Sequence, residues 1–164
     1  AWRIENEKIQ EHWDALVPIP QEQLDLLING DGNGEKEVSS ETRHSNKSLV
    51  QKFMDHVFNR GQVDRINEFV SKDFKGRISA DNQLQGISDL RHYIDDANGG
   101  RLTHDKKMII ASGDLVMAHS HYFGENERVV FDWFRVAEGL IVDHWVVSQL
   151  FTPQEEVANE HPHF

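Results

Sequence analysis

The sequence predicts an α+β fold in which helices cover one face of an antiparallel sheet. Residues 45–58 repeat apolar side chains at the spacing of an amphipathic helix, and two shorter segments, 63–70 and 88–97, show the same pattern. From residue 102 onward the chain consists of four segments rich in β-branched and aromatic residues. Helices followed by a run of strands are typical of this fold class.

The first helix is expected to begin near Ser45 or Asn46, because both residue types are effective N-caps. Residues 59–61, which read Asn-Arg-Gly, are expected to end it. The third helix is expected to begin near Ser88 and to end at residues 98–100, Asn-Gly-Gly, which suit a left-handed C-cap. The side chains expected to face the core are Val50, Phe53, Met54, Val57 and Phe58 in the first helix, Val63, Ile66, Phe69 and Val70 in the second, and Leu90, Ile94 and Ala97 in the third.

Strands occupy the rest of the predicted domain. A short strand is expected over residues 74–78, between the second and third helices. Four longer strands are expected over residues 102–112, 114–123, 128–136 and 140–151. Because short connections that contain Gly or Asn separate these four strands, they are predicted to form an antiparallel meander.

A sequence pattern occurs twice and suggests the domain organisation. Residues 2–13 and 134–145 both read as aromatic-Arg-β-branched, a polar turn, then Ile, an acid and His-Trp, and each copy predicts a β-hairpin. We interpret residues 1–20 as the orphan C-terminal hairpin of a preceding repeat. Residues 21–44 are expected to form a short helix and a flexible linker, and residues 45–164 a complete domain.

Charge and composition restrict the partners. The formal net charge is −11 at pH 7, and the basic residues are scattered along the chain. Such a chain repels phosphates and anionic lipids, so neither a nucleic acid nor a membrane is expected as a partner. No apolar run approaches the roughly 18 residues that span a bilayer. The chain contains no cysteine, which fits a reducing compartment, and a cytoplasmic location is expected.

Several short motifs, in this order and spacing, resemble a known family. They are Ala118-His119-Ser120-His121, Phe131-Asp132-Trp133-Phe134-Arg135, Asp143-His144-Trp145 and the final residues 158–164. Residues 46–164 thereby resemble the SnoaL-like branch of the nuclear transport factor 2-like superfamily, particularly the SnoaL-like aldol-condensation enzymes. The resemblance implies a conical, cystatin-like barrel, in which a curved antiparallel sheet with three helices packed on one face encloses a mostly apolar pocket.

Asp132 and His144 are the first candidates for catalysis. If the turn at residues 137–139 has three residues, Val136 pairs with Leu140, and Asp132 then lies opposite His144. A carboxylate beside an imidazole orients the ring and raises its basicity, as a general base for a carbon-bound proton requires.

His119 and His121 are the other two catalytic candidates. Their spacing places both rings on one face of a strand, where together with Asp132 they could form a two-His, one-carboxylate metal site. We favour this alternative less and expect no metal. The resemblance implies chemistry without metal or cofactor, in which His and Asp serve as acid and base, and therefore points to His119, His121, Asp132 and His144.

Four residues are candidates for substrate binding: Arg77, Phe134, Trp145 and Tyr122. Arg77 stands where relatives usually carry a His, and its guanidinium group could pair with a carboxylate or an enolate oxygen. Phe134 is expected to share a face with Asp132 and Val142 and to provide an apolar wall. Tyr122 and Trp145 could stack on a flat substrate, although the register places Trp145 on the opposite face and aromatic residues more often fill a core or a dimer interface.

Two functions stay open from the sequence. One is a small-molecule enzyme, an aldol-type cyclase, lyase or isomerase, that acts on an apolar or carbonyl-containing molecule. The other is a non-catalytic ligand-binding or dimerisation module of the same fold. Arg77 and Val146 favour it, because they replace a His and an acid that relatives usually carry, whereas Asp132, His144 and the two histidines His119 and His121 favour the enzyme. The resemblance implies a homodimer formed through the sheet. The N-terminal hairpin is expected to dock on the sheet of its own domain or of a partner chain, since an isolated hairpin is marginally stable.

Overall fold

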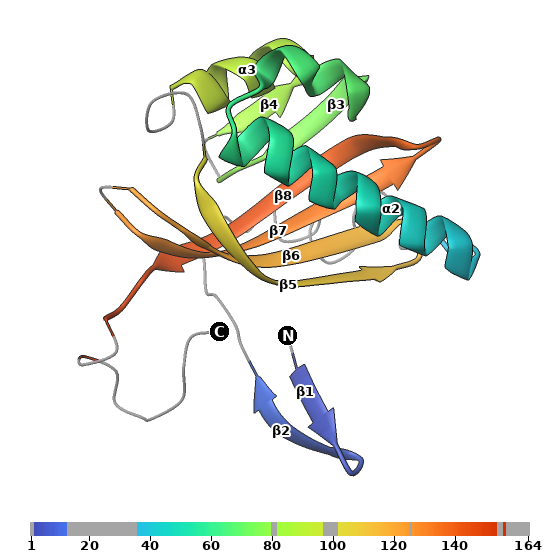
Figure 1. Cartoon of the computed structure of the whole chain (residues 1–164), viewed down its shortest axis with the longest axis vertical. Helices are drawn as coiled ribbons and strands as arrows, with labels where there is room; N and C mark the ends of the chain where they lie inside the picture. The colour runs from blue at the N-terminus through green and yellow to red at the C-terminus, as the bar shows by residue number, and fades with distance from the viewer. Residues whose placement is uncertain are drawn as a thin grey trace, which may run out of the picture.

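A six-stranded sheet curves around the helices, with the strand order β4-β3-β8-β7-β6-β5 (Figure 1). The strands are β3 (Val70–Arg77), β4 (Gln83–Gln85), β5 (His104–Ser112), β6 (Leu115–Tyr122), β7 (Arg128–Ala137) and β8 (Leu140–Leu150). This computed structural model describes residues 2–12, 36–79, 82–96, 102–124, 126–153 and 156. The predicted α+β class and the meander of four long strands are confirmed.

The sheet is mixed rather than wholly antiparallel. Strands β5 to β8 form the expected antiparallel meander, whereas β3 pairs with β8 in parallel. A parallel pair needs a long connection, which the chain between β3 and β8 supplies. The short strand β4 was not expected, and β3 begins earlier than the predicted strand at residue 74.

The helices occupy one side of the sheet (Figure 1). They are α2 (Ser40–Phe53), a π-helical continuation η1 (Met54–Asn59), a 3-10 helix η2 (Val63–Glu68) and α3 (Gly86–Asp95). The second predicted helix is therefore a 3-10 helix. The helix expected at residues 21–28, most of the linker and the expected C-cap at residues 98–100 lie outside the described residues.

The start of α2 corrects the sequence prediction. The hydroxyl group of Ser39 accepts a hydrogen bond from the Thr42 amide at 3.1 Å and caps the helix. Just upstream, Lys36 exchanges two hydrogen bonds with Asp114, at 2.9 and 3.0 Å. Asn46, expected as a cap, is instead buried within the helix. The folded domain therefore extends back to Lys36, into the segment that the sequence assigned to a linker.

The core lies between the helices and the concave face of the sheet. Every described side chain that was expected to face inward from the first helix is buried in it, as are Ile66, Leu90 and Ile94. Phe53 makes edge-to-face contacts with Phe58 and Phe134, at centroid distances of 4.8 and 5.9 Å. These contacts tie the helical layer to β7.

The convex face of the sheet carries a second apolar cluster. Met117, Val129 and Phe131 are buried there, while Trp133 on the same strand is 39% exposed. A homodimer formed through the sheet stays a prediction.

The N-terminal hairpin consists of β1 (Trp2–Glu5) and β2 (Lys8–His12), which form a separate two-stranded sheet. Its register repeats that of β7 and β8 residue for residue. Trp2 pairs with His12 as Phe134 pairs with His144, and both hairpins contain one extra residue, Gln10 in β2 and Val142 in β8.

Both hairpins also turn through two residues with positive φ, Asn6 and Glu7 in the first and Glu138 and Gly139 in the second. The match supports the interpretation as a repeat, which stays a proposal. Among the described residues, the hairpin strands do not join the six-stranded sheet, so the expected addition to the domain's own sheet is not observed. Docking on a partner chain stays a prediction.

No helix within the described ranges has the length and apolar character needed to cross a membrane.

Replacing Ser39 by Ala should lower the free energy of unfolding by about 1 kcal/mol, because the first turn of α2 loses its cap. Urea unfolding followed by circular dichroism measures the change. Ser45→Ala is the matched control, since Ser45 lies exposed within the helix, where Ala is the better helix former. A larger loss at Ser45 than at Ser39 would place the helix start where the sequence alone predicted it.

Candidate functional site

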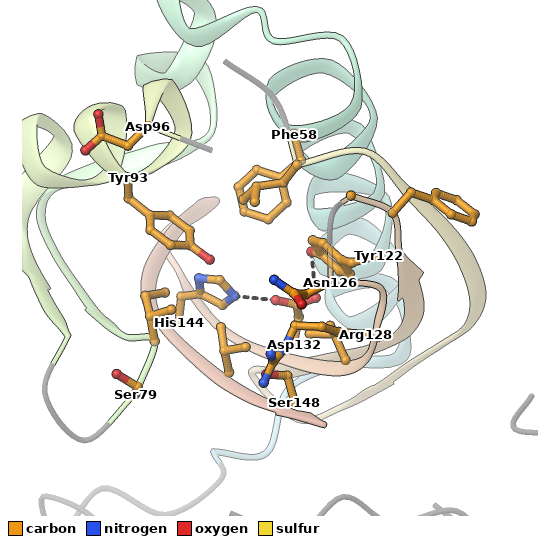
Figure 2. A pocket seen from close by; sticks show the side chains of 16 residues that line it. Phe58, Ser79, Tyr93, Asp96, Tyr122, Asn126, Arg128, Asp132, His144 and Ser148 are labelled. Carbon is orange, nitrogen blue, oxygen red and sulfur yellow. Dashed lines mark hydrogen bonds and ion pairs between the residues drawn. The ribbon is translucent and has the colours of Figure 1, made fainter. Parts of the chain in front are cut away.

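A pocket of about 740 Å³ opens between the helical layer and the concave face of the sheet (Figure 2). Phe58 of η1 and Tyr93 of α3 line one side, and alternate residues of β7 and β8 line the other. This volume lies in the range of small-molecule sites. Among the lining residues, Asp132 and His144 are the pair on which the site is centred (Figure 2).

Asp132 accepts two hydrogen bonds inside the domain. The Nε2 atom of His144 lies 2.7 Å from its Oδ1 atom, and the Tyr122 hydroxyl group donates to its Oδ2 atom at 2.9 Å. The side chains of Asp132 and His144 are both 2% exposed. A buried carboxylate needs such donors, because its desolvation would otherwise be costly.

The strand register differs from the one expected, yet it brings the same two side chains together. Asp132 pairs with Val146, and Phe134 pairs with His144. The turn has two residues rather than three, and Val142 is an extra residue in β8, so the register shifts by two in total. Because side chains alternate with a period of two, a shift of two leaves Asp132 and His144 on one face, as diagonal neighbours. Val142 was expected on the same face as Asp132 and Phe134. Ile141 lies on that face instead and is fully buried in the core.

The His144 ring is held in one orientation. It stacks on Phe134 at 4.4 Å with an interplanar angle of 4°, and Phe58 lies 6.1 Å away. Because Asp132 is an acceptor, the proton of a neutral ring sits on Nε2. The Nδ1 atom is then an acceptor, buried and without a hydrogen-bond partner among the described residues, and Figure 2 shows it on the side of the ring toward Tyr93. The arrangement leaves a free basic nitrogen beside the pocket.

Two tyrosine hydroxyl groups flank this pair (Figure 2). Burial, together with the negative charge of Asp132, raises the pKa of Tyr93 to about 12 and that of Tyr122 well above its ordinary value. Both hydroxyl groups therefore keep their protons near neutral pH and act as donors. Tyr122 donates to Asp132, whereas the Tyr93 hydroxyl group points toward His144.

Arg128 and Ser148 lie farther along the same two strands. The Arg128 Nε atom donates to the Ser148 hydroxyl oxygen at 2.9 Å, and both side chains line the pocket. Phe123, Gly124 and Asn126, from the connection between β6 and β7, line the pocket nearby and are exposed. This end of the pocket is therefore the one nearer to solvent.

The structure places His119 and His121 away from this pocket. His119 stacks on Phe131 at 4.3 Å on the convex face, and His121 contacts Glu127 at 2.9 Å. Ala118 faces the core, and it is Ala118, not His119, that pairs with Asp132. The two-His, one-carboxylate metal site considered from the sequence is therefore wrong for these residues, because Asp132 projects from the opposite face of the sheet.

The predicted substrate-binding residues separate into two groups. Tyr122 lines the pocket, and Phe134 lies behind the His144 ring, 0% exposed. Trp145 is on the convex face, where the Arg135 guanidinium group lies 5.6 Å from its ring centroid. Arg77 pairs with Trp145 across β3 and β8, and the neighbouring Ile78 lines the pocket instead.

Tyr93, Arg128 and Ser148 were not among the residues predicted for the site. For Arg128 a signal existed, since it alternates with Val130 and Asp132 and must share their face of β7. Tyr93 follows the inward Leu90 by three residues, so its place on the inner side of α3 was also within reach. Ser148 alternates in the same way with Val146 and His144, so it must share their face of β8.

The family model described as a SnoaL-like domain matches residues 50–144. Among solved structures, a protein from Kribbella flavida assigned as a ketosteroid isomerase aligns with a TM-score of 0.62 and 14% identity, covering 73% of this chain and 92% of its own. A protein from Jannaschia assigned as a SnoaL-like polyketide cyclase aligns with a TM-score of 0.60 and 14% identity, and the alignment covers 69% of this chain and 91% of that protein.

An LEH-like epoxide hydrolase from M. tuberculosis aligns with a TM-score of 0.55 and 15% identity, covering 66% of this chain and 85% of its own. A further structural match is an NTF2-like protein of unknown function from Mesorhizobium loti, and another, from Xanthomonas campestris, is described as having a cystatin-like fold. At these identities the structures establish the fold. The comparison with curated protein sequences gives no match.

Acid should destabilise the domain partly through His119. Burial lowers the pKa of His119 from 6.5 to about 4, so unfolding takes up a proton between these pH values. The stability contributed by the neutral ring is present above about pH 6.5 and is lost as the pH falls to 4, at a cost of about 3 kcal/mol. Urea unfolding from pH 7 to pH 4 measures this, and the fall should be smaller in His119→Leu. His44→Leu, on the exposed face of α2, is the control, and identical pH dependence in wild type and His119→Leu would contradict the assignment.

Proposed function

Because the chain belongs to the SnoaL-like domain family, we propose that its pocket carries out acid–base chemistry on a small carbonyl compound, with His144 as the general base. The observation that supports this most directly is the buried hydrogen bond between Asp132 and His144, which leaves Nδ1 unprotonated beside the pocket. The names of two structural neighbours, a ketosteroid isomerase and a polyketide cyclase, are consistent with such chemistry.

The proposed first step removes a proton from the carbon next to the carbonyl group. His144 Nδ1 takes the proton, the electron pair of the broken C–H bond forms a carbon–carbon double bond, and the carbonyl oxygen becomes an enolate oxygen. The imidazolium ring that results is stabilised by the Asp132 carboxylate, which already accepts from Nε2. In an unsaturated ketone the enolate is conjugated with a carbon–carbon double bond, and return of the proton to the far carbon of this system completes an isomerisation. In an aldol closure the enolate carbon attacks a second carbonyl group, and the alkoxide that forms takes the proton from His144.

The enolate oxygen needs a hydrogen-bond donor, and Tyr93 is placed to supply one. Its hydroxyl group points into the pocket near His144, and its raised pKa of about 12 keeps it protonated (Figure 2). A donor held in place before reaction stabilises developing negative charge without reorganisation. Tyr122 has a different role, because its proton is already donated to Asp132 and is not available to the enolate oxygen. Asp132 accepts a hydrogen bond on each of its oxygens, whereas His144 Nδ1 accepts none among the described residues, and this favours His144 over Asp132 as the base.

The test is hydrogen exchange at carbon, followed by NMR in D₂O with cyclohexanone and long-chain methyl ketones as probes. His144→Gln should slow exchange at least about a hundredfold, because a general base contributes roughly that factor or more. Asp132→Asn should also slow it, because the amide side chain can present its nitrogen to Nε2 and reverse the tautomer. His92→Gln, an exposed position on α3, is the matched control and should have no effect.

Exchange that survives both substitutions would contradict the proposal. Ketone binding that needs Phe58 and Tyr93 but is accompanied by no exchange would instead support the second candidate, a ligand-binding module. The observation that favours this second candidate is Val146, which lines the pocket at the position where an acid usually follows His-Trp.

A further inference from the structure

We propose that Arg128 forms a carboxylate-binding subsite at the open end of the pocket, so that the substrate is an apolar oxo acid with its carboxylate at one end and its reacting carbonyl at the other. The inference names a substrate class for the proposed function and rests on it. It arises from the charge and spacing of the β7 and β8 residues that line the pocket.

Arg128 carries a positive charge that no carboxylate neutralises within the described residues. Its side chain is partly buried, and the hydrogen bond from Nε to Ser148 holds it against the pocket wall (Figure 2). That bond uses one of five guanidinium N–H donors, and the terminal nitrogens make no hydrogen bond within the described residues. Two other partly buried arginine residues do have acidic partners, Arg65 with Glu68 at 2.7 Å and Arg135 with Asp143 at 3.7 Å. A planar group of this kind binds a carboxylate with two parallel hydrogen bonds.

The guanidinium group lies within electrostatic range of the proposed catalytic residues. The pKa of Tyr93 is raised by burial and by Asp132, and the Arg128 charge partly opposes these effects. Arg128 is also one of the residues that line the pocket, together with Asp132 and His144.

The spacing along β7 sets the length of the ligand. The Arg128 guanidinium group is held at the level of Ser148, which pairs with Val130. Asp132 is the next inward-facing residue of β7 after Val130. Phe134, which pairs with His144, is the one after that. Inward-facing residues repeat about every 7 Å along a strand, so the anion and the reacting carbon lie roughly 7 to 13 Å apart. Val130 and Val146 line the wall between them. A ligand with a polar group at each end and a hydrocarbon segment between them fits this order of residues.

The charge balance favours a monoanion. Arg128 provides one positive charge, whereas Asp96 and Asp132 also line the pocket and are acidic. A phosphate group, which carries nearly two negative charges near neutral pH, would be repelled by these acids with a single cation to hold it. A carboxylate matches the single guanidinium group in both charge and geometry.

The test compares two ligands, 7-oxooctanoate and its methyl ester, which differ only in the charge of the carboxyl group and its methyl group. Titration calorimetry measures the Kd of each for the full chain. Wild type should bind the acid about tenfold or more tightly than the ester, since a charge-assisted hydrogen bond contributes that much. Arg128→Gln should abolish this preference and leave the Kd of the ester within about twofold, and Arg128→Lys should restore part of it.

Arg43→Gln is the matched control, because it makes the same change in net charge on the exposed face of α2. The inference is overturned if Arg128→Gln and Arg43→Gln weaken the acid equally, which would indicate long-range charge alone, or if wild type does not distinguish acid from ester. Thermal unfolding of each variant reports whether the fold is intact. If Arg128→Gln does not fold, Arg128→Lys replaces it in the comparison, and an acid preference equal to that of wild type would then overturn the two-bond subsite.

Hydrogen exchange with the neutral ester, measured in parallel, separates the inference from the proposed function. Exchange that depends on His144 without any acid preference would leave the function standing and overturn the carboxylate subsite. An acid preference that depends on Arg128, without exchange of either ligand, would support the subsite and contradict the catalytic role of His144.

Discussion

One extra residue in β8 decides which face of the sheet carries the candidate site. Val142 is the bulge between two stretches of the β7–β8 ladder, and the pairing changes there from Val136 with Ile141 to Arg135 with Asp143. Without the bulge, the register that leaves the turn would continue and pair Asp132 with Trp145. A slip of one residue turns every later side chain of β8 to the other face. Trp145 would then enter the pocket, and His144 would lie on the convex surface.

The bulge thereby links backbone geometry to acid–base chemistry. It sets His144 diagonally across from Asp132, where the imidazole ring stacks on Phe134, lies near Phe58 and is 2% exposed. Burial strengthens the electrostatic interaction within the pair and makes an unmatched polar atom costly. Both oxygens of Asp132 accept a hydrogen bond. The polar atom of the pair that has no hydrogen-bond partner among the described residues is His144 Nδ1, and this is the atom that would accept a proton from the substrate.

Much of this fold could be predicted from the chain, because the periodicity of its helices and the alternation of its strands reflect a single buried core. The pairing of Asp132 with His144 was also predicted, although from a register that was wrong: a turn one residue too long and an unrecognised bulge shifted the register in the same direction, by two residues in all, and so kept the face. Bulges depend on tertiary packing and leave little local trace, although the repeated hairpin places one at Gln10 as well. His119 illustrates the opposite case, since its motif suggested chemistry while the strand alternation placed it on the convex face beside Phe131.

The central claim is that Asp132 fixes the tautomer of His144, and long-range ¹H–¹⁵N correlation NMR of the imidazole ring tests it most directly. We expect a neutral ring with its proton on Nε2 and an unprotonated Nδ1 whose chemical shift responds when a ketone binds. In Asp132→Asn the preference for this tautomer should weaken or reverse. A ring protonated on Nδ1 in the wild-type protein would contradict the account, because the nitrogen beside the pocket could then not accept a proton.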